Sequence, residues 1–206
     1  MWYDAGKEME EVIDGKKLQY LPVALMVLIS IIFSGCVSPG GNASATTIDP
    51  AVKDWRLTLN GTSEKILTLE DLRNYPAVTG YGYAVSTTGI MFGPYTCTGV
   101  DLRDLIADVG GMNPNDRIWI SAPDGYMWVF DAEQLTGKGF VTFNTDLKEI
   151  PSPPLRIILM YEQDKKPVSY DDGGPARIVI MSDEPGIVTE GSAWVKWVNK
   201  IEIKKK

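Results

Sequence analysis

An apolar run near the N-terminus constrains this chain most, because it decides which residues remain to build a folded domain. Residues 21–36 read LPVALMVLISIIFSGC, and the basic pair Lys16 and Lys17 precedes them. A basic flank, an apolar core and small residues at a cleavage site follow the order of an export signal. We therefore predict that residues 1–36 serve as a signal or membrane anchor, and that the fold forms from the residues after them.

The end of this run resembles the lipidation motif of bacterial lipoproteins, since Ser34 and Gly35 lead directly to Cys36. This resemblance predicts that Cys36 is lipidated. The alternative is a plain anchor helix that stays uncleaved, because residues 18–37 are long enough to cross the hydrocarbon core. In both cases the membrane is a partner of the N-terminal segment. The lysine pair is expected to stay in the cytoplasm, which places the folded domain outside the cell.

The rest of the chain reads as a tether followed by one domain. Residues 37–51 are small and polar, with too few apolar side chains to pack, and they predict a flexible tether. Residues 52–206 are long enough to bury the core of one ordinary domain. The net charge of −7 argues against a nucleic-acid partner, because nucleic-acid-binding proteins generally carry a basic surface.

The absence of histidine from the whole sequence excludes several kinds of site. Histidine is the commonest metal ligand and general base, so we expect no zinc site and no catalytic triad built on imidazole. The chain also lacks a Cys-x-x-Cys-His motif, so we expect no attached haem. Apart from Cys36, the one thiol of the chain is Cys97.

Local patterns predict two short helices and a first strand. Residues 55–61 alternate apolar and polar side chains and end in Asn-Gly, as in a half-buried strand before a turn. Thr68 is followed three residues later by an acid, and is predicted to cap a helix over residues 69–74. Residues 101–109 place apolar side chains at i, i+3, i+4 and i+7 before a Gly-Gly cap, which predicts the second helix.

The remaining regular segments read as strands, because they are rich in Ile, Val, Trp and Tyr and are separated by Pro, Gly and Asp. They cover residues 117–121, 126–130, 155–162, 177–181 and 196–203. Many strands with two short helices predict a β-rich α+β domain. The alternation of strands and helices that a dinucleotide-binding fold needs does not occur in the sequence.

The order of eight segments resembles the molybdopterin-binding domain of the sulfite oxidase-like oxidoreductases. The segments are WRLTLNG, LTLEDLRNYP, VSTTG, YTCTGVDLRDLI, ISAPDGYMWVF, LRIILMYEQDKKPV, GGPARIVI and VKWVNKIEI, within residues 52–203. The resemblance implies the fold of that family, a β-rich α+β single domain with a few short helices. It also implies molybdopterin as the cofactor and oxidoreductase activity on a small oxyanion or oxide.

The sequence departs from this family at the metal ligand. In the family, a cysteine on the loop after the first helix binds molybdenum through its thiolate. Here that loop is residues 83–89, and the cysteine position falls at Ser86 or Thr87. Cys97 lies in a different register, before the second helix, so it is a candidate ligand only if residues 90–98 fold back toward Ser86. The competing interpretation of Cys97 is a small buried residue.

Three further positions match the family's cofactor pocket. Asp124 lies in the DGY turn, which is near the mouth of the pocket in that family, although a plain β-turn explains the same residues. Arg177 in GPAR and Lys196 in VKW match basic residues that meet the pterin phosphate. Arginine suits a phosphate through its bidentate fork, and lysine suits it as a point charge. The alternative for both is an exposed charge on an alternating strand.

Five aromatic side chains are candidates either for the wall of a ligand pocket or for the core, namely Trp119, Tyr126, Trp128, Trp194 and Trp197.

The sequence leaves two functions open. The first is a membrane-tethered molybdopterin oxidoreductase domain, with the pterin phosphate near Arg177 and Lys196 and the metal near Ser86 and Thr87. The second is a non-catalytic, surface-tethered module that binds a ligand or a protein and keeps the fold without the metal. The missing cysteine and the absence of histidine favour the second function.

Overall fold

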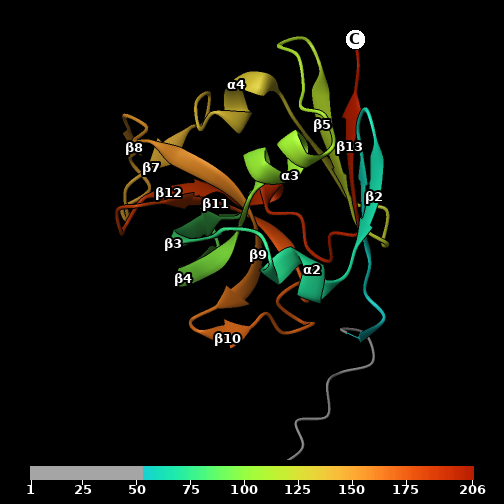
Figure 1. The fold of residues 1–206 in the computed structure, drawn as a ribbon. Helices are drawn as coiled ribbons and strands as arrows, with labels where there is room; N and C mark the ends of the chain where they lie inside the picture. The colour runs from blue at the N-terminus through green and yellow to red at the C-terminus, as the bar shows by residue number, and fades with distance from the viewer. Residues whose placement is uncertain (1–52) are drawn as a thin grey trace, which may run out of the picture. The chain divides into compact units, whose positions relative to one another are not determined.

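Residues 53–206 are described by the computed structural model, and they form two β-sheets connected by short helices and loops (Figure 1). The predicted export segment, Cys36 and the predicted tether lie outside the described residues. The longest helix between residues 53 and 206 is α3 (Leu102–Asp108), with seven residues. No helix in this part of the chain has the length and apolar character needed to span a membrane.

The first sheet has five strands in the order β2, β1, β13, β5, β6. Their bounds are β1 Leu57–Asn60, β2 Glu64–Leu67, β5 Arg117–Ser121, β6 Met127–Phe130 and β13 Lys200–Lys204. Three of the strands bury every second side chain, and the buried residues are Leu57, Leu59, Ile118, Ile120, Ile201 and Ile203. This alternation turns one face of the sheet to the core. β13 pairs in parallel with β1, so the first and last described strands are neighbours.

The second sheet has eight strands, of which four pair in a closed ring. The ring strands are β3 Ala77–Val85, β4 Met91–Asp101, β9 Leu155–Gln163 and β11 Arg177–Ser182. β3 pairs with β4, β4 with β9, β9 with β11, and β11 with β3. The shorter strands are β7 Thr142–Phe143, β8 Glu149–Ile150, β10 Lys166–Pro167 and β12 Val188–Glu190. Every residue of β11 is buried, which places this strand at the centre of the domain.

The helices are short and their starts are set by side-chain caps. At α2 (Leu69–Arg73) the Thr68 hydroxyl accepts from the Asp71 amide, and the Asp71 carboxylate accepts from the Thr68 amide, which completes a capping box. α3 is capped by Asp101 and packs on β4 and β9. The Val109 carbonyl, just past α3, accepts from the Thr62 amide in the β1–β2 turn, at 2.8 Å. α3 therefore links the two sheets. α4 covers Ala132–Leu135.

Residues 191–199 connect β12 of the second sheet to β13 of the first sheet, and we call them the crossover segment. The segment begins with a 3-10 turn, η1 (Gly191–Ala193). It is held against the start of β11 by two backbone hydrogen bonds, from Ile178 to the Val195 carbonyl at 2.8 Å and from Val198 to the Ala176 carbonyl at 3.0 Å. This passage between the sheets positions the candidate site.

The predicted β-rich α+β fold with a few short helices is confirmed. Two differences from the sequence-based prediction concern the site. The strands β3 and β4 are not predicted, although they are among the longest strands of the domain. The predicted strand 196–203 begins only at Lys200, because residues 196–198 bond to neighbouring loops in the crossover segment.

Candidate functional site

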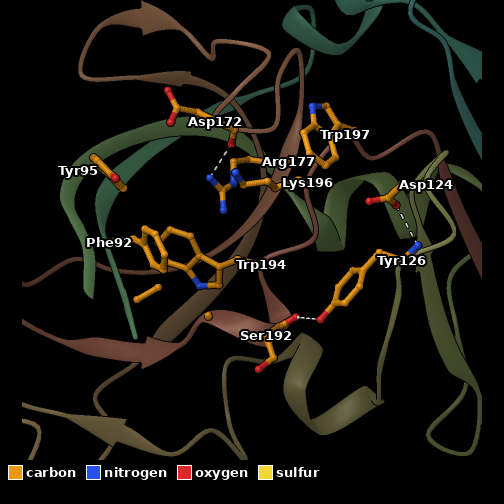
Figure 2. Close-up of a pocket in the computed structure, with 12 residues that line it drawn as sticks. Phe92, Tyr95, Asp124, Tyr126, Asp172, Arg177, Ser192, Trp194, Lys196 and Trp197 are labelled. Atoms are coloured by element: carbon orange, nitrogen blue, oxygen red, sulfur yellow. Dashed lines mark hydrogen bonds between the residues drawn. The ribbon is translucent and has the colours of Figure 1, made fainter. Parts of the chain in front are cut away.

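A cavity of about 350 Å³ is lined by residues from both sheets and from the crossover segment (Figure 2). Its wall consists of Ala84, Phe92 and Tyr95 from β3 and β4, Asp124 and Tyr126 from the β5–β6 turn, Asp172 and Arg177 before and at the start of β11, and Gly191, Ser192, Trp194, Lys196 and Trp197 from the crossover segment. A cavity of this size suits a small organic ligand. The wall combines aromatic faces with two cations.

Arg177 is the buried charge of this cavity, and the residue is only 9% exposed. Its Nη1 donates to the Asp172 carbonyl at 2.6 Å, and its guanidinium carbon lies 5.4 Å from the Trp194 ring centre. Its Nε is buried without a hydrogen-bond partner within residues 53–206, and the ion pairs found there do not include Arg177. Burial lowers the pKa of Arg177 from its ordinary value. A buried cation with an open donor favours the binding of an anion.

Lys196 brings a second cation to the same cavity. Its Nζ donates to the Asp171 carbonyl at 2.8 Å and lies 5.5 Å from the Trp197 ring centre. Burial lowers the pKa of Lys196, and the positive charge of Arg177 lowers it further. An anion between the two side chains would offset the repulsion between their charges and would strengthen both as donors.

The backbone of residues 170–173 holds these side chains in place. Successive carbonyls at 170, 171 and 172 accept hydrogen bonds from Trp197 Nε1, Lys196 Nζ and Arg177 Nη1. The Gly173 carbonyl accepts from the Trp197 amide at 2.8 Å. Trp197 has a φ of 51°, in the left-handed region, where a non-glycine residue costs about 1–3 kcal/mol. The two hydrogen bonds of Trp197 to this segment keep it in that conformation.

Tyr126 connects the first sheet to the crossover segment across one side of the cavity. Its hydroxyl donates to the Ser192 carbonyl at 2.7 Å, and its amide donates to the Asp124 carboxylate at 2.9 Å (Figure 2). The Asp124 side chain therefore shapes the DGY turn as well as lining the cavity. The sequence allows one turn to serve as a plain β-turn and as part of a pocket rim, and here the same residues form the turn and line the cavity.

Cys97 lies outside the cavity wall and is fully buried. A Cβ atom added to Gly82 would lie 2.6 Å from Cys97 Sγ and 2.9 Å from Trp194 Cη2, so the thiol packs close to the Trp194 ring. Burial raises the pKa of Cys97 to about 12, which keeps the thiol neutral at physiological pH. The β-ladder pairs Cys97 with Gly80, about 20 Å along the strand from Ser86. The fold-back that would bring this thiol to Ser86 does not occur.

Ser86 and Thr87 lie in the tight turn between β3 and β4, and neither lines the cavity. The Ser86 amide donates to the Ile90 carbonyl at 2.8 Å, and the Ser86 hydroxyl accepts from the Ile90 amide at 3.0 Å. The β3 side chain that does reach the cavity is that of Ala84. The cofactor-binding roles assigned to Ser86 and Thr87 remain predictions, and their hydroxyls lie at the hairpin turn.

The structure brings three of the predicted cofactor-binding residues together, because Asp124, Arg177 and Lys196 line one cavity. Their assignment to a pterin ligand remains a prediction. Of the aromatic candidates, Tyr126, Trp194 and Trp197 line the cavity, whereas Trp119 and Trp128 do not.

Phe92, Tyr95 and Asp172 are cavity residues that the sequence does not predict. Residues 95–100, YTCTGV, are rich in aromatic and β-branched side chains, which favours a strand and could have placed Tyr95 in β4. The same residues are also interpreted as the entry to the helix α3. No local pattern identifies Asp172 as a cavity residue, because it lies in an acidic turn that also reads as a solvent-exposed loop.

Comparison with protein families matches residues 43–206 to the oxidoreductase molybdopterin binding domain. The chain belongs to this family. The family predicted from the order of the eight segments is thereby confirmed. Comparison with curated proteins gives no match.

The fold is similar to that in the crystal structure of the sulfane dehydrogenase SoxCD from Paracoccus pantotrophus, with a TM-score of 0.59 and 20% sequence identity. The match covers 77% of this chain and 40% of that one. The present chain thus corresponds to less than half of the SoxCD chain, and the similarity concerns the fold.

The cavity fits one part of molybdopterin and lacks a counterpart for another. The guanidinium of Arg177 and the Nζ of Lys196 suit its phosphate, and the indole faces suit its planar ring. The thiolate ligand for molybdenum has no counterpart in the cavity wall. Residues 53–206 also contain no group of three Cys, Asp or Glu side chains arranged to hold a metal ion. We therefore assign no bond between this domain and a metal.

Proposed function

We propose that this domain binds molybdopterin by its phosphate and pterin ring, on the outer face of the cell membrane, where residues 1–36 tether it. The observation that carries this proposal is Arg177, a buried cation whose Nε lacks a partner within residues 53–206 and whose guanidinium lies over Trp194. Lys196 completes a phosphate site, and the faces of Trp194 and Trp197 form the walls for a planar ring.

Binding is tested by producing the full chain in cells with active cofactor synthesis and measuring the pterin that it retains. Arg177→Gln and Lys196→Gln should each weaken retention, by about 1.5–3 kcal/mol, because each removes a charged donor to phosphate. Lys204→Gln is the matched control, since Lys204 lies over Trp119, which is outside the cavity. Equal retention by all four proteins would contradict the proposal.

The family supports an oxidoreductase domain, for which we propose a small oxyanion or oxide as the substrate, and the redox chemistry would come from the bound cofactor. The second candidate is a non-catalytic binding module, and the position of Cys97 behind Trp194 favours it. Metal analysis separates the two. Stoichiometric molybdenum in the unmodified protein that is lost in Cys97→Ala would rule out the second candidate.

Restoring a thiol tests whether only the ligand is missing. Ala84→Cys places a thiol in the cavity wall, whereas Ser86→Cys places one at the hairpin turn. We expect bound molybdenum to rise in Ala84→Cys and to stay unchanged in Ser86→Cys. An increase in Ser86→Cys alone would mean that the hairpin turn, not Ala84, faces the metal position.

The proposed location rests on the apolar segment that ends at Cys36. Cys36→Ala should abolish lipid attachment and leave a longer, uncleaved N-terminus. Mass spectrometry and membrane partition check this. Masses that differ only by the substituted sulfur atom, with identical membrane partition, would leave the plain anchor helix as the means of attachment.

A further inference from the structure

The cavity wall contains a carboxylate that does not pair with the buried cation next to it. Asp172 lines the cavity, and its carbonyl accepts from Arg177, yet its carboxylate forms no ion pair with Arg177. The carboxylate instead accepts from the Ser169 hydroxyl at 2.7 Å, and the same hydroxyl accepts from the Asp172 amide at 3.1 Å. Figure 2 shows the carboxylate of Asp172 turned away from the guanidinium of Arg177.

Rotation of the Asp172 side chain toward Arg177 would reduce the positive charge that the cavity offers to a ligand. Charge-assisted hydrogen bonds are about twice as strong as neutral ones, and within residues 53–206 the buried Nε of Arg177 has no hydrogen-bond partner. An internal carboxylate on Nε would satisfy that donor and would compete with a ligand phosphate for the same guanidinium. The two groups already interact, since burial lowers the pKa of Arg177 while the negative charge of Asp172 opposes this effect.

We propose that Ser169 holds the Asp172 carboxylate away from Arg177, and so keeps the cation available to a phosphate-bearing ligand from solution. This inference rests on the proposed function, because it concerns the affinity of the same cavity. Ser169 is not part of the cavity wall, so it acts as a positioning residue through Asp172. The pair forms within one turn, because residues 169–172 bring the hydroxyl back to the carboxylate and to the amide.

The ligand chemistry follows from the same geometry. A phosphomonoester on a planar aromatic group would place its anion at Arg177 and Lys196 and its ring against the indoles. Phenyl phosphate has both features and is a suitable probe. Its affinity can be measured by calorimetry on the full chain kept in mild detergent.

Four variants and two controls test the inference. Ser169→Ala should weaken phenyl phosphate binding about tenfold, because the released carboxylate competes for Arg177. Asp172→Asn should bind at least as tightly as the unmodified protein, and the double variant should regain the affinity of Asp172→Asn. A merely structural role of Ser169 would not give this recovery. Asp172→Glu should also weaken binding, since the longer side chain no longer fits the Ser169 hydroxyl.

The controls separate failure of the inference from failure of the proposed function. Ser169→Thr keeps a hydroxyl and should bind as the unmodified protein does, and Arg177→Gln should lose binding. If the unmodified protein and Arg177→Gln bind alike, or neither binds, both proposals are wrong. If Arg177→Gln alone loses binding while Ser169→Ala is unaffected, or the double variant stays weak, only the role of Ser169 is overturned. Melting temperatures of the variants identify any that do not fold, and Asp172→Glu then decides the result.

Discussion

Replacing Arg177 with methionine should make the ligand-free domain more stable, although it destroys the proposed anion site. Removing an ion from water into the protein interior costs several kcal/mol of folding free energy, and we take about 4 kcal/mol for Arg177, which is 9% exposed. Against this, the substitution removes the charged hydrogen bond to the Asp172 carbonyl, worth about 2 kcal/mol, and the contact with Trp194, worth about 1 kcal/mol. The expected gain in unfolding free energy is about 1 kcal/mol.

Urea denaturation followed by circular dichroism measures this change, and the melting temperature should rise by about 2–4 °C. The control is Arg156→Met, because Arg156 pairs with Asp183 on the surface at 3.1 Å. An exposed pair contributes about 0–1 kcal/mol, so this control should lower stability slightly. Added phosphate should then stabilise the unmodified protein and leave Arg177→Met unaffected. A loss of more than about 1 kcal/mol in Arg177→Met would show that Arg177 supports the fold rather than a ligand.

Three further predictions concern residues near or away from the cavity. Gly82→Ala should cost about 1–3 kcal/mol of unfolding free energy, because its Cβ would lie 2.6 Å from Cys97 Sγ and 2.9 Å from Trp194 Cη2. Cys97→Ala in the double variant should relieve only part of that cost, since the Trp194 contact remains, and denaturation curves would show this. Iodoacetamide at pH 8 should modify Cys97 only as fast as the domain unfolds, since the thiol is buried and its pKa is about 12; fast labelling of folded protein would contradict this. Hydrogen bonds from Lys65 and Tyr75 lower the pKa of Asp108 in the folded domain. The ionised carboxylate therefore contributes fully to folding stability above the unfolded pKa near 4, and this contribution is lost as pH falls through the lower folded pKa. Asp108→Asn should therefore remove part of the acid-induced loss of stability below about pH 4, and an unchanged pH profile would count against it.

The sequence predicts the parts of the fold whose causes lie close together in the chain. The cap of α2 needs only a hydroxyl next to the helix start, and α3 shows its apolar spacing within its own residues; both helices occur within two residues of their predicted bounds. The alternating strands β1 and β5 are predictable for the same reason, because each shows its buried face within its own residues.

The long hairpin of β3 and β4 could not be predicted in this way. β4 contains Gly93, Pro94 and Gly99, which read as loop residues. Gly99 is needed because a Cβ there would lie 2.3 Å from the Leu159 carbonyl oxygen of β9, a strand far along the chain. The reason for this glycine is a close approach that exists only in the folded domain.

The sequence predicts which basic residues line the candidate site, but it does not predict how the side chains of the site are arranged. Arg177 and Lys196 follow from the family resemblance, and they share one cavity. The position of Cys97 depends on the register of β4 against β3, which the sequence does not specify. The Asp172 carboxylate stays away from Arg177 because it accepts a hydrogen bond from Ser169 within one turn. Serine and aspartate form such turns in many proteins, so the sequence gives no specific signal for this arrangement.

The parallel pairing of β1 with β13 affects the order in which the domain can fold. The two strands stand at opposite ends of the described chain, with Leu59 opposite Ile201, so the first sheet closes only after nearly the whole domain has been synthesised. Contacts between such distant residues slow folding, because a long loop must be closed before they form. The crossover segment is the last segment before β13, so the cavity and the first sheet should be completed in the same late step. Until then β1 and β2 form a hairpin in which the β1 edge that later pairs with β13 is exposed. A chaperone would need to protect this edge from aggregation.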